Sequence, residues 1–596
     1  MNNPLRTLSH PAQAIRASGG LARVLPLLLF AWVTVSSSSA QDVVLPDLAP
    51  REVEITGDLT ISFPSLRRQP LIGFNPPPRV PEIPVSRIPF SEAYKQPSAD
   101  LPPSPLQPPS PPAVSSLASR MPARGYVTAT AGRYLDRTVE GVLTLSLTER
   151  SSTTLDINYF GTNGQDVGPG NASSARDLFN GDLTWNRMAP GGWFTAQAGL
   201  TRNAWSLFGA TPDAFSGASP NPDRTLTSWF TGLAHETRAG SRIGSHTRLE
   251  VERTLVETDI FNPDVRVDPS TARQTQRLSL DSYLEIPAGP VGVRFDVAGG
   301  MHGFDTGNAL DVSTLKYGEA ALVFLTPRDR ILTLDIGGSV MGYDSEAQTA
   351  SGSERYLAWF APVLRARYWL GGGLFVTGGT RPGLEATSLK AAYDVHPFLM
   401  DEPLVLPRMN SVDAYLGVEL TSVSFNGVLS AGWTDSPSAS YARVPTTSLK
   451  GYTSGYFAYD HARTRTTWVE GDLTYIASTA LEAGVRLRVQ DAQLEETEQA
   501  LPFVSPVSSR IWVTSSFLDA RLQLLSAIRF ESARPVQPGG DNDGDSLLDA
   551  ELNGQWWIRP ELGITVGIRH LLSEPTFWPG YPLESTAVRA GLRWRW

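Results

Sequence analysis

The feature that most constrains the fold is a two-residue alternation of apolar and polar side chains, which recurs from about residue 125 to the end of the chain. Near the C-terminus, Leu562, Ile564, Val566 and Ile568 alternate with small or polar residues. A period of two places successive side chains on opposite faces of an extended strand. Each such segment therefore predicts a two-faced β-strand, and this part of the chain is expected to be all-β.

The last segment, "STAVRAGLRWRW", indicates what the two faces contact. One face carries Trp594 and Trp596, and the other carries Arg589, Arg593 and Arg595. In an outer-membrane barrel the apolar face contacts lipid and the arginines line a wet lumen. A soluble barrel of this size would expose a much larger apolar surface than monomeric proteins tolerate. The pattern therefore favours a membrane barrel.

Short turns alternate with long polar connections, as is typical of outer-membrane barrels. Ten tight turns are expected, around Arg150, Ala189, Gly240, Ala288, Arg328, Gly371, Ser422, Ser478, Asp519 and Pro560. They join twenty strands, and one further strand at each end gives a transmembrane antiparallel β-barrel of about 22 strands over residues 125–596. Both barrel ends then lie on the short-turn, periplasmic side. The expected location is the outer membrane of a Gram-negative-type bacterium.

The first 40 residues have the pattern of a secretory signal peptide. Basic residues and no acidic ones precede the apolar stretch "VLPLLLFAWVTV", and small residues precede a cleavage site before Gln41. This stretch is too short to cross a bilayer as a helix, and no longer apolar run follows. The chain contains no cysteine, so a disulfide framework is excluded. The formal net charge of −10 argues against a nucleic-acid partner.

Residues 41–124 form a proline-rich periplasmic extension that is expected to be largely irregular. The stretches "FNPPPRVPEIPVSRIP" and "LPPSPLQPPSPPA" favour polyproline II. One piece, "REVEITGDLTISF", alternates and either adds a strand to the sheet edge of a partner or is part of a linker.

Aromatic and basic residues of the strands suggest roles at the membrane and in the lumen. Trp193, Trp369, Trp594 and Trp596 lie near strand ends and are expected to anchor the barrel at the membrane interfaces. The arginines expected to line the lumen are Arg365, Arg367, Arg486, Arg488, Arg529, Arg569, Arg589, Arg593 and Arg595. They either form a path for an anionic solute or pair in structural ladders with Asp335, Glu482, Asp549 and Glu551.

The acidic segment "DNDGDSLLDAE" resembles a calcium-binding loop. Asp541, Asp543, Asp545 and Asp549 occupy its positions 1, 3, 5 and 9, which supply oxygen ligands in such loops. Ser546 replaces the glycine of the pattern and Leu552 its glutamate, so a solvated acidic loop is the alternative. Apart from this calcium hypothesis, no cofactor is expected.

The segment 381–410 is the longest stretch without clear alternation. Tyr393, His396, Phe398 and Met400 within it either bind a ligand, fold into the barrel mouth or pack on neighbouring loops. Histidines are scattered through the chain, and none has the spacing of a catalytic triad or a metal site. The protein is therefore not expected to be an enzyme.

A count of about 22 strands resembles the barrel of TonB-dependent receptors, in which a globular plug fills the lumen. The segments "FWPGYPLESTAVRAGLRWRW" and "LKAAYDVHPFLMDEPLVLPRMNSVDAYLGVEL" are similar to barrel segments of receptor-like outer-membrane proteins. The resemblance also implies that the final aromatic strand is read by the barrel-insertion machinery. A plug needs more mixed α/β sequence than residues 41–124 provide, and no energy-coupling box is recognisable.

Two functions are compatible with these observations. The first is solute transport or ligand binding across the outer membrane by a receptor-like barrel. The second is a structural or partner-binding barrel whose extension docks a periplasmic or lipoprotein partner, or supplies the missing plug. The sequence does not name the solute.

Overall fold

The structure, a computed structural model, describes residues 124–596 except for gaps at 149, 167–172, 215–216, 220, 238–242, 261–270, 290, 306–311, 328–330, 346–355, 401–405, 448–450, 539–543, 573–577 and 583–584. The predicted signal peptide and nearly all of the predicted extension, including its alternating piece, lie outside these residues. Asp541 and Asp543 of the calcium hypothesis also lie outside them.

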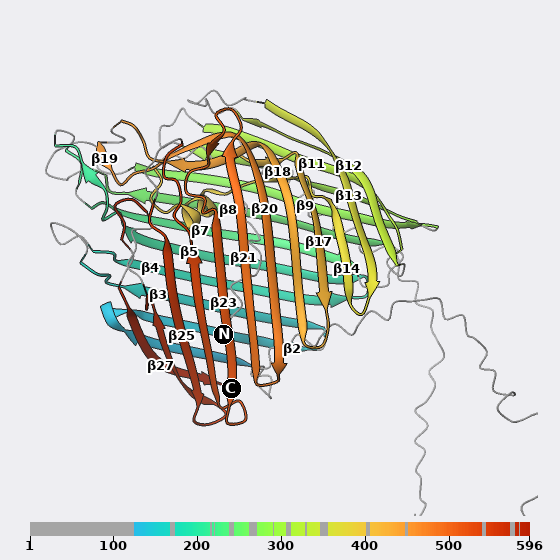
Figure 1. The fold of residues 1–596 in the computed structure, drawn as a ribbon. Helices are drawn as coiled ribbons and strands as arrows, with labels where there is room; N and C mark the ends of the chain where they lie inside the picture. Colours follow the sequence, from blue (N-terminus) through green and yellow to red (C-terminus); the bar gives the residue numbers. More distant parts are fainter. Residues whose placement is uncertain are drawn as a thin grey trace, which may run out of the picture. The chain divides into compact units, whose positions relative to one another are not determined.

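A single antiparallel sheet closes on itself into a barrel of 22 strands, which confirms the predicted fold class (Figure 1). The closing pair joins the first strand to the last, from Tyr126 opposite Arg595 to Gly132 opposite Arg589. Lipid offers no hydrogen bonds to a free strand edge, so closure satisfies the backbone within the wall.

The wall strands are β1 (Gly125–Gly132), β2 (Arg137–Thr148), β3 (Ser151–Thr162), β4 (Arg176–Ala189), β5 (Gly192–Ser206), β7 (Asp223–Thr237), β8 (Gly244–Thr258), β9 (Thr271–Ala288), β10 (Val291–Asp305), β11 (Val312–Leu325), β12 (Leu332–Ser345), β13 (Tyr356–Gly371), β14 (Leu374–Thr380), β17 (Val412–Thr421), β18 (Phe425–Arg443), β20 (Ala458–Ser478), β21 (Leu481–Leu494), β23 (Val507–Phe517), β24 (Leu522–Glu531), β25 (Leu547–Trp557), β26 (Leu562–Arg569) and β27 (Ala587–Arg595).

Shorter elements lie in the connections: β6 (Thr211–Pro212), β15 (Gly383–Glu385), β16 (Arg408–Asn410), β19 (Tyr452–Ser454), β22 (Gln499–Ala500), the 3-10 helix η1 (Arg133–Leu135) and the α-helix α3 (Leu389–Val395). No helix in the described part of the chain is long and apolar enough to cross a bilayer.

Short turns and long connections lie at opposite ends of the barrel. Eight of the ten expected turns fall at short junctions between sequential wall strands, from β2–β3 to β25–β26, and Gly240 and Arg328 lie outside the described residues. The chain enters and leaves the wall at this same end, because the Arg124 backbone N–H donates to the Trp596 carbonyl at 2.7 Å. The other end carries the long connections and is the outer end of the barrel in the usual orientation.

The outer face of the wall is apolar, as the alternation predicts. On β27, Leu592 is 56% exposed and Trp594 is 59% exposed, and both lie on the same face as Val588. The same face of the sheet continues through exposed side chains on other strands, such as Val340, Phe360, Leu416, Leu429, Ile511, Ile528 and Val566. Such a belt is stable in lipid and unfavourable in water, so the barrel spans a membrane.

The wall is uneven near β14. This strand has 7 residues, whereas its neighbour β13 has 16 and β18 has 19. Beyond Thr380 the chain leaves the wall and folds inward as β15, α3 and β16 before it rejoins the wall at Val412. We call the described residues of this excursion, 381–400 and 406–411, the inner lobe.

Candidate functional site: the charged inner wall and the closed mouth

The nine arginines predicted to line the lumen all have the inward register. Arg486 and Arg488, for example, alternate with the exposed apolar residues Val485, Leu487 and Val489 of β21. Seven of the nine lie in one stretch of the wall between β21 and β27, on the strands β21, β24, β26 and β27: Arg486, Arg488, Arg529, Arg569, Arg589, Arg593 and Arg595. The inner wall is therefore densest in positive charge near the barrel seam.

Three arginines lie directly opposite one another on adjacent strands. The register pairs Arg486 with Arg510 and Arg510 with Arg529. Asp472 stands opposite Arg486 at one end of this row, and Asp549 stands opposite Arg529 at the other. Like charges directly opposite each other destabilise a sheet, so this row, which we call the arginine row, has an electrostatic cost.

Carboxylates beside the row offset part of that cost. Arg486 Nε donates to Asp472 Oδ2 at 2.8 Å, and Arg510 Nη2 donates to Glu551 Oε1 at 2.8 Å. Arg529 pairs with Glu531 two residues further along its own strand. The guanidinium groups remain substantially exposed to the lumen, so these pairs are partly solvated and individually weak.

A hollow of about 410 Å³ lies over the arginine row. Its lining combines the three arginines of the row with Arg488, Glu470, Glu531, Asp549 and Glu551. The short side chains of Ser508 and Ala527 lie between these long charged ones. The hollow thus arises where small residues on β23 and β24 are surrounded by guanidinium and carboxylate groups.

The remaining predicted arginines are engaged elsewhere on the inner wall. Arg365 lies directly opposite Asp335, and Arg367 Nη2 donates to Glu419 Oε2 at 2.9 Å. Arg569 Nη2 donates to Asp136 Oδ2 at 2.9 Å. The terminal arginines stack on inner aromatic rings: Arg593 lies 3.9 Å from the centre of the Tyr126 ring and Arg595 3.9 Å from that of Trp557. Arg589 lies opposite Gly567 and Gly132.

The four predicted anchoring tryptophans do not share one face. Trp594 and Trp596 point outward and contact each other with ring centroids 5.7 Å apart. Trp369 instead has the register of Arg365 and Arg367, and Trp193 lies opposite Met188 and Glu236 on the inner face. The inward register of Trp193 and Trp369 does not bring them to the lipid face, and anchoring at the membrane interfaces stays a prediction for the four tryptophans.

The acidic segment is only partly described. Asp545 is exposed just before β25, and Asp549 lies on the inner face of β25 with its Oδ2 3.1 Å from His570 Nδ1. No group of three or more acidic, histidine or cysteine side chains that could hold a metal occurs within the described ranges. Calcium binding stays a prediction.

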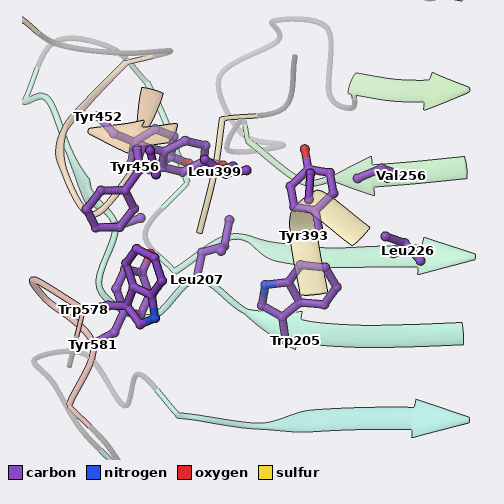
Figure 2. Packing of buried hydrophobic residues seen from close by; sticks show 14 of the residues in the cluster. Trp205, Leu207, Leu226, Val256, Tyr393, Leu399, Tyr452, Tyr456, Trp578 and Tyr581 are labelled. Carbon is purple, nitrogen blue, oxygen red and sulfur yellow. The ribbon is translucent and has the colours of Figure 1, made fainter. Parts of the chain in front are cut away.

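The outer mouth contains a hydrophobic core built from the long connections (Figure 2). Its largest buried members are Leu207, Tyr393, Leu399, Tyr452, Tyr456, Phe457 and Tyr581. These residues come from the connections β5–β7, β14–β17, β18–β20 and β26–β27, which are far apart in the sequence. We call this cluster the mouth core, and it ties the outer loops into one packed unit.

The inner lobe joins the mouth core to the inner wall. Pro397 O accepts hydrogen bonds from Trp205 Nε1 at 3.1 Å and from Arg224 Nη1 at 3.0 Å. Arg224 is fully buried, and its guanidinium lies 4.7 Å from the centre of the Tyr393 ring. The inner lobe therefore packs into the mouth on inward-facing side chains, with Tyr393 buried and Phe398 and Met400 packed against the core.

A second contact fixes the other half of the lobe. Leu384, Leu406 and Met409 pack against the inward-facing Leu315, Met341, Tyr343 and Ala361 of β11–β13. The Leu384 backbone N–H donates to Glu319 Oε2 at 3.0 Å. The lobe thus lies against the inner wall from β5 to β13, while the hollow lies on β20–β25.

Sequence reasoning missed several residues of this site. Asp472 and Glu470 were not named as partners of the arginines, and Arg510 was not named at all. The alternation does predict an inward position for Arg510, because Arg510 precedes the outward Ile511 in the same way as Arg486 precedes the outward Leu487. Arg224 has no such signal, since its contacts join residues more than 170 positions apart.

The chain can be compared with family models, with curated proteins and with solved structures. No family model and no curated protein matches the sequence. Solved structures do match: the copper transporter OprC has a TM-score of 0.59 at 11% identity and covers 80% of each chain. The FrpB iron transporter from Neisseria meningitidis has a TM-score of 0.62 at 9% identity and covers 80% of this chain and 82% of its own.

A ferric enterobactin receptor from Pseudomonas aeruginosa, in complex with enterobactin, has a TM-score of 0.58 at 12% identity and covers 79% of this chain and 81% of its own. The chain has the fold of a TonB-dependent receptor barrel. Such a closed barrel with a lipid-facing belt places this receptor-like protein in the outer membrane of a Gram-negative-type bacterium. The matched proteins are transporters and receptors rather than enzymes.

Proposed function

We propose that this receptor-like barrel passes an anionic solute across the outer membrane, and that the arginine row is the surface the solute contacts. The observation that supports the proposal is the direct register of Arg486, Arg510 and Arg529 across three strands. An anion in the lumen would offset the repulsion between these adjacent arginines, which gives the row a function despite its electrostatic cost.

The geometry of the row suits a transient contact. Each guanidinium is exposed to the lumen and has a carboxylate at its side, which orients its planar fork. The hollow above Ser508 and Ala527 provides room for an anionic group of modest size. Conduction requires binding that is favourable enough to admit a solute and weak enough to release it.

The structural neighbours suggest which solutes to test first. Their names concern copper, iron and ferric enterobactin. Among these, a ferric chelate of an acidic ligand has the charge that the arginine row would attract. Anionic metal chelates are therefore the first candidates, and simple inorganic anions are the reference.

Single-channel recordings in planar bilayers test the proposal. Arg510→Gln should lower the permeability of anions relative to cations, whereas Arg510→Lys should retain most of the preference because it keeps the charge. Arg465→Gln is the matched control, since Arg465 lies on the outer face of β20 and is paired with Glu495. An anion-to-cation ratio that is the same in Arg510→Gln and wild type would exclude the arginine row as the selective surface.

A second function is favoured by where the described chain begins. Arg124 bonds to Trp596 at the short-turn end, so residues before it start from the periplasmic side of the barrel. We propose that residues 1–40 are a signal peptide and that residues 41–124 are an extension that docks a periplasmic or lipoprotein partner. A pull-down with the 41–124 peptide from an envelope extract would recover that partner; recovery of no envelope protein would contradict the second function.

A further inference from the structure

The inner lobe is attached to the barrel differently from the wall strands. β15 and β16 pair with each other, and the only register pair that links them to a wall strand in the described structure is Met409 with Ser438 of β18. α3 has 7 residues, and its N-terminus is capped by Ser388 Oγ, which accepts from the Ala391 N–H at 3.1 Å. Side-chain contacts, rather than a hydrogen-bonded ladder, therefore hold most of the lobe in place.

These contacts converge on a few points. Trp205 and Arg224 both donate to the single carbonyl of Pro397. Tyr393 donates through its hydroxyl to Met400 O at 2.9 Å and lies beneath the Arg224 guanidinium. Backbone hydrogen bonds of Phe398 and Met400 with Phe457 also hold the lobe, and none of these interactions belongs to the pairing of the wall strands.

The inner wall beside the lobe contains buried polar atoms that favour movement of the lobe away from it. Glu252, Arg277 and His302 lie in direct register across β8, β9 and β10, and each is at most 5% exposed. Glu252 Oε2, Arg277 Nη1 and both ring nitrogens of His302 have no hydrogen-bond partner. His302 also contacts Phe304 and Tyr317, which pack against the same buried cluster as the lobe residue Leu384.

A buried polar group without a partner costs on the order of 1–3 kcal/mol, because it has lost its hydration. Glu252 Oε1 and Arg277 Nε have partners, so the cost comes from His302 and from the unpaired Glu252 Oε2 and Arg277 Nη1, and it raises the free energy of the closed arrangement. Movement of the lobe away from β8–β11 would let water reach them and recover part of this cost. The packing of the mouth core favours the closed arrangement, whereas hydration of these polar groups favours the open one. The free energies of the closed and open arrangements are therefore closer than the packing alone would make them.

We propose that the inner lobe is a gate: α3 and the β15–β16 hairpin close the outer mouth in the arrangement described, and they swing away from the β5–β13 side to admit solute. This inference rests on the proposed transport function. It assigns the closing role to a connection of the barrel itself and requires no other domain.

The absence of cysteine from the chain allows a clean test by cross-linking. Leu399 of the lobe and Phe457 of the β18–β20 connection are paired by a β-bridge, and both are buried. Bridge partners have the Cα separation that a disulfide accepts, about 4.5–5.5 Å. The double variant Leu399→Cys, Phe457→Cys in the full chain should therefore form a disulfide that fixes the lobe.

Under the proposal, oxidation of this variant abolishes solute-dependent conductance in planar bilayers, and a reductant restores it. The control pair Thr211→Cys, Ser454→Cys joins β6 to β19, two outer connections that do not include the lobe. Its conductance should be the same in oxidised and reduced forms. The reduced form of each double variant serves as its own test of correct folding.

A release variant provides the opposite perturbation. Tyr393→Ala removes the ring beneath Arg224 and the bond to Met400, and it should raise the open probability several-fold. Tyr283→Ala is the control, because Tyr283 lies on β9 and stacks with His246 instead of the lobe. Conductance that persists unchanged in the oxidised Leu399→Cys, Phe457→Cys protein overturns the gate but leaves the transport proposal intact. Silence of both the reduced protein and Tyr393→Ala overturns the transport proposal and the gate with it.

Discussion

Acidification should loosen the mouth core through a single histidine. His396 follows α3 and is partly buried between the rings of Trp578, at a centroid distance of 5.3 Å, and Tyr459, at 6.2 Å. Burial, reinforced by the nearby positive charge of Arg534, lowers the pKa of His396 from 6.5 to about 4. Burial also lowers the pKa of Arg534 to about 10, which leaves it charged at any physiological pH. His396 is therefore neutral in the packed mouth core at neutral pH.

The sign of the effect follows from proton linkage. Between about pH 6.5 and the folded pKa of about 4, the loosened core binds a proton at His396 that the packed core excludes. The stabilising contribution is thus fully present above pH 6.5 and is lost as the pH falls toward 4. Each pH unit of difference corresponds to about 1.4 kcal/mol, so the core loses about 2 kcal/mol at pH 5 and about 3 kcal/mol at most.

Tryptophan fluorescence and limited proteolysis of the purified protein measure this loss. Trp578 touches His396, so its emission should change between pH 7.5 and 5, and the outer connections should become more sensitive to protease while the wall strands stay folded. His396→Phe keeps an aromatic ring and should remove the pH dependence. A mouth core that is equally protected at pH 7.5 and 5, or an unchanged acid response in His396→Phe, would refute the reasoning.

Three further predictions follow from the packing. Arg224→Leu removes donors to Pro397 O and Thr258 Oγ1 and should weaken the mouth core by about 3 kcal/mol, measured as faster proteolysis of the outer connections without a change in the melting of the wall. Leu592→Arg places a charge on the lipid face of β27 and should cost about 2–4 kcal/mol in an unfolding titration from lipid bilayers, whereas Leu592→Ile should be nearly neutral. Gly591→Val sets a side chain against Ala129 O and Thr130 Cα of β1 at the seam, and it should abolish the compact, heat-modifiable form on gels.

The wall could be predicted because both of its determinants are local. Alternation gives the two faces of each strand, and the turn residues between strands mark the short junctions. For this reason the strand number agrees with the structure, as do the eight expected turns that lie within the described residues. The outward position of Trp594 and the inward position of Arg593 follow from the same count of alternate residues.

Aromatic character near a strand end is a weaker guide to the face of a residue than alternation. Trp193 and Trp369 are expected to anchor the barrel because tryptophans near strand ends are common at interfaces. Alternation alone would have placed Trp369 with Arg367, two residues earlier, on the inner face. Parity along the strand is therefore the stronger indicator, and aromatic character should be used only after the face has been determined.

The mouth core and the arginine row could not be predicted in full for a different reason. Tyr393 meets Trp205 and Arg224, which lie on the paired strands β5 and β7 and are distant from Tyr393 in sequence. The arginine row requires the relative register of three neighbouring strands, and a shift of two residues would separate Arg510 from Arg486. A single sequence indicates which face of the sheet each residue lies on, but it does not give the register between neighbouring strands.

Strand length connects these observations to the inward fold of the lobe. β14 ends seven residues above its turn, while β13 continues to Tyr356 and β18 to Arg443. A chain that leaves the wall this early must pair its backbone elsewhere, and β15 with β16 does so. Its apolar residues Leu384 and Met409 then require cover, which the inner faces of β11–β13 supply. A short alternating segment between long neighbours, followed by an extended stretch without alternation, is thus the sequence pattern that should indicate an in-barrel lobe in other receptor-like chains.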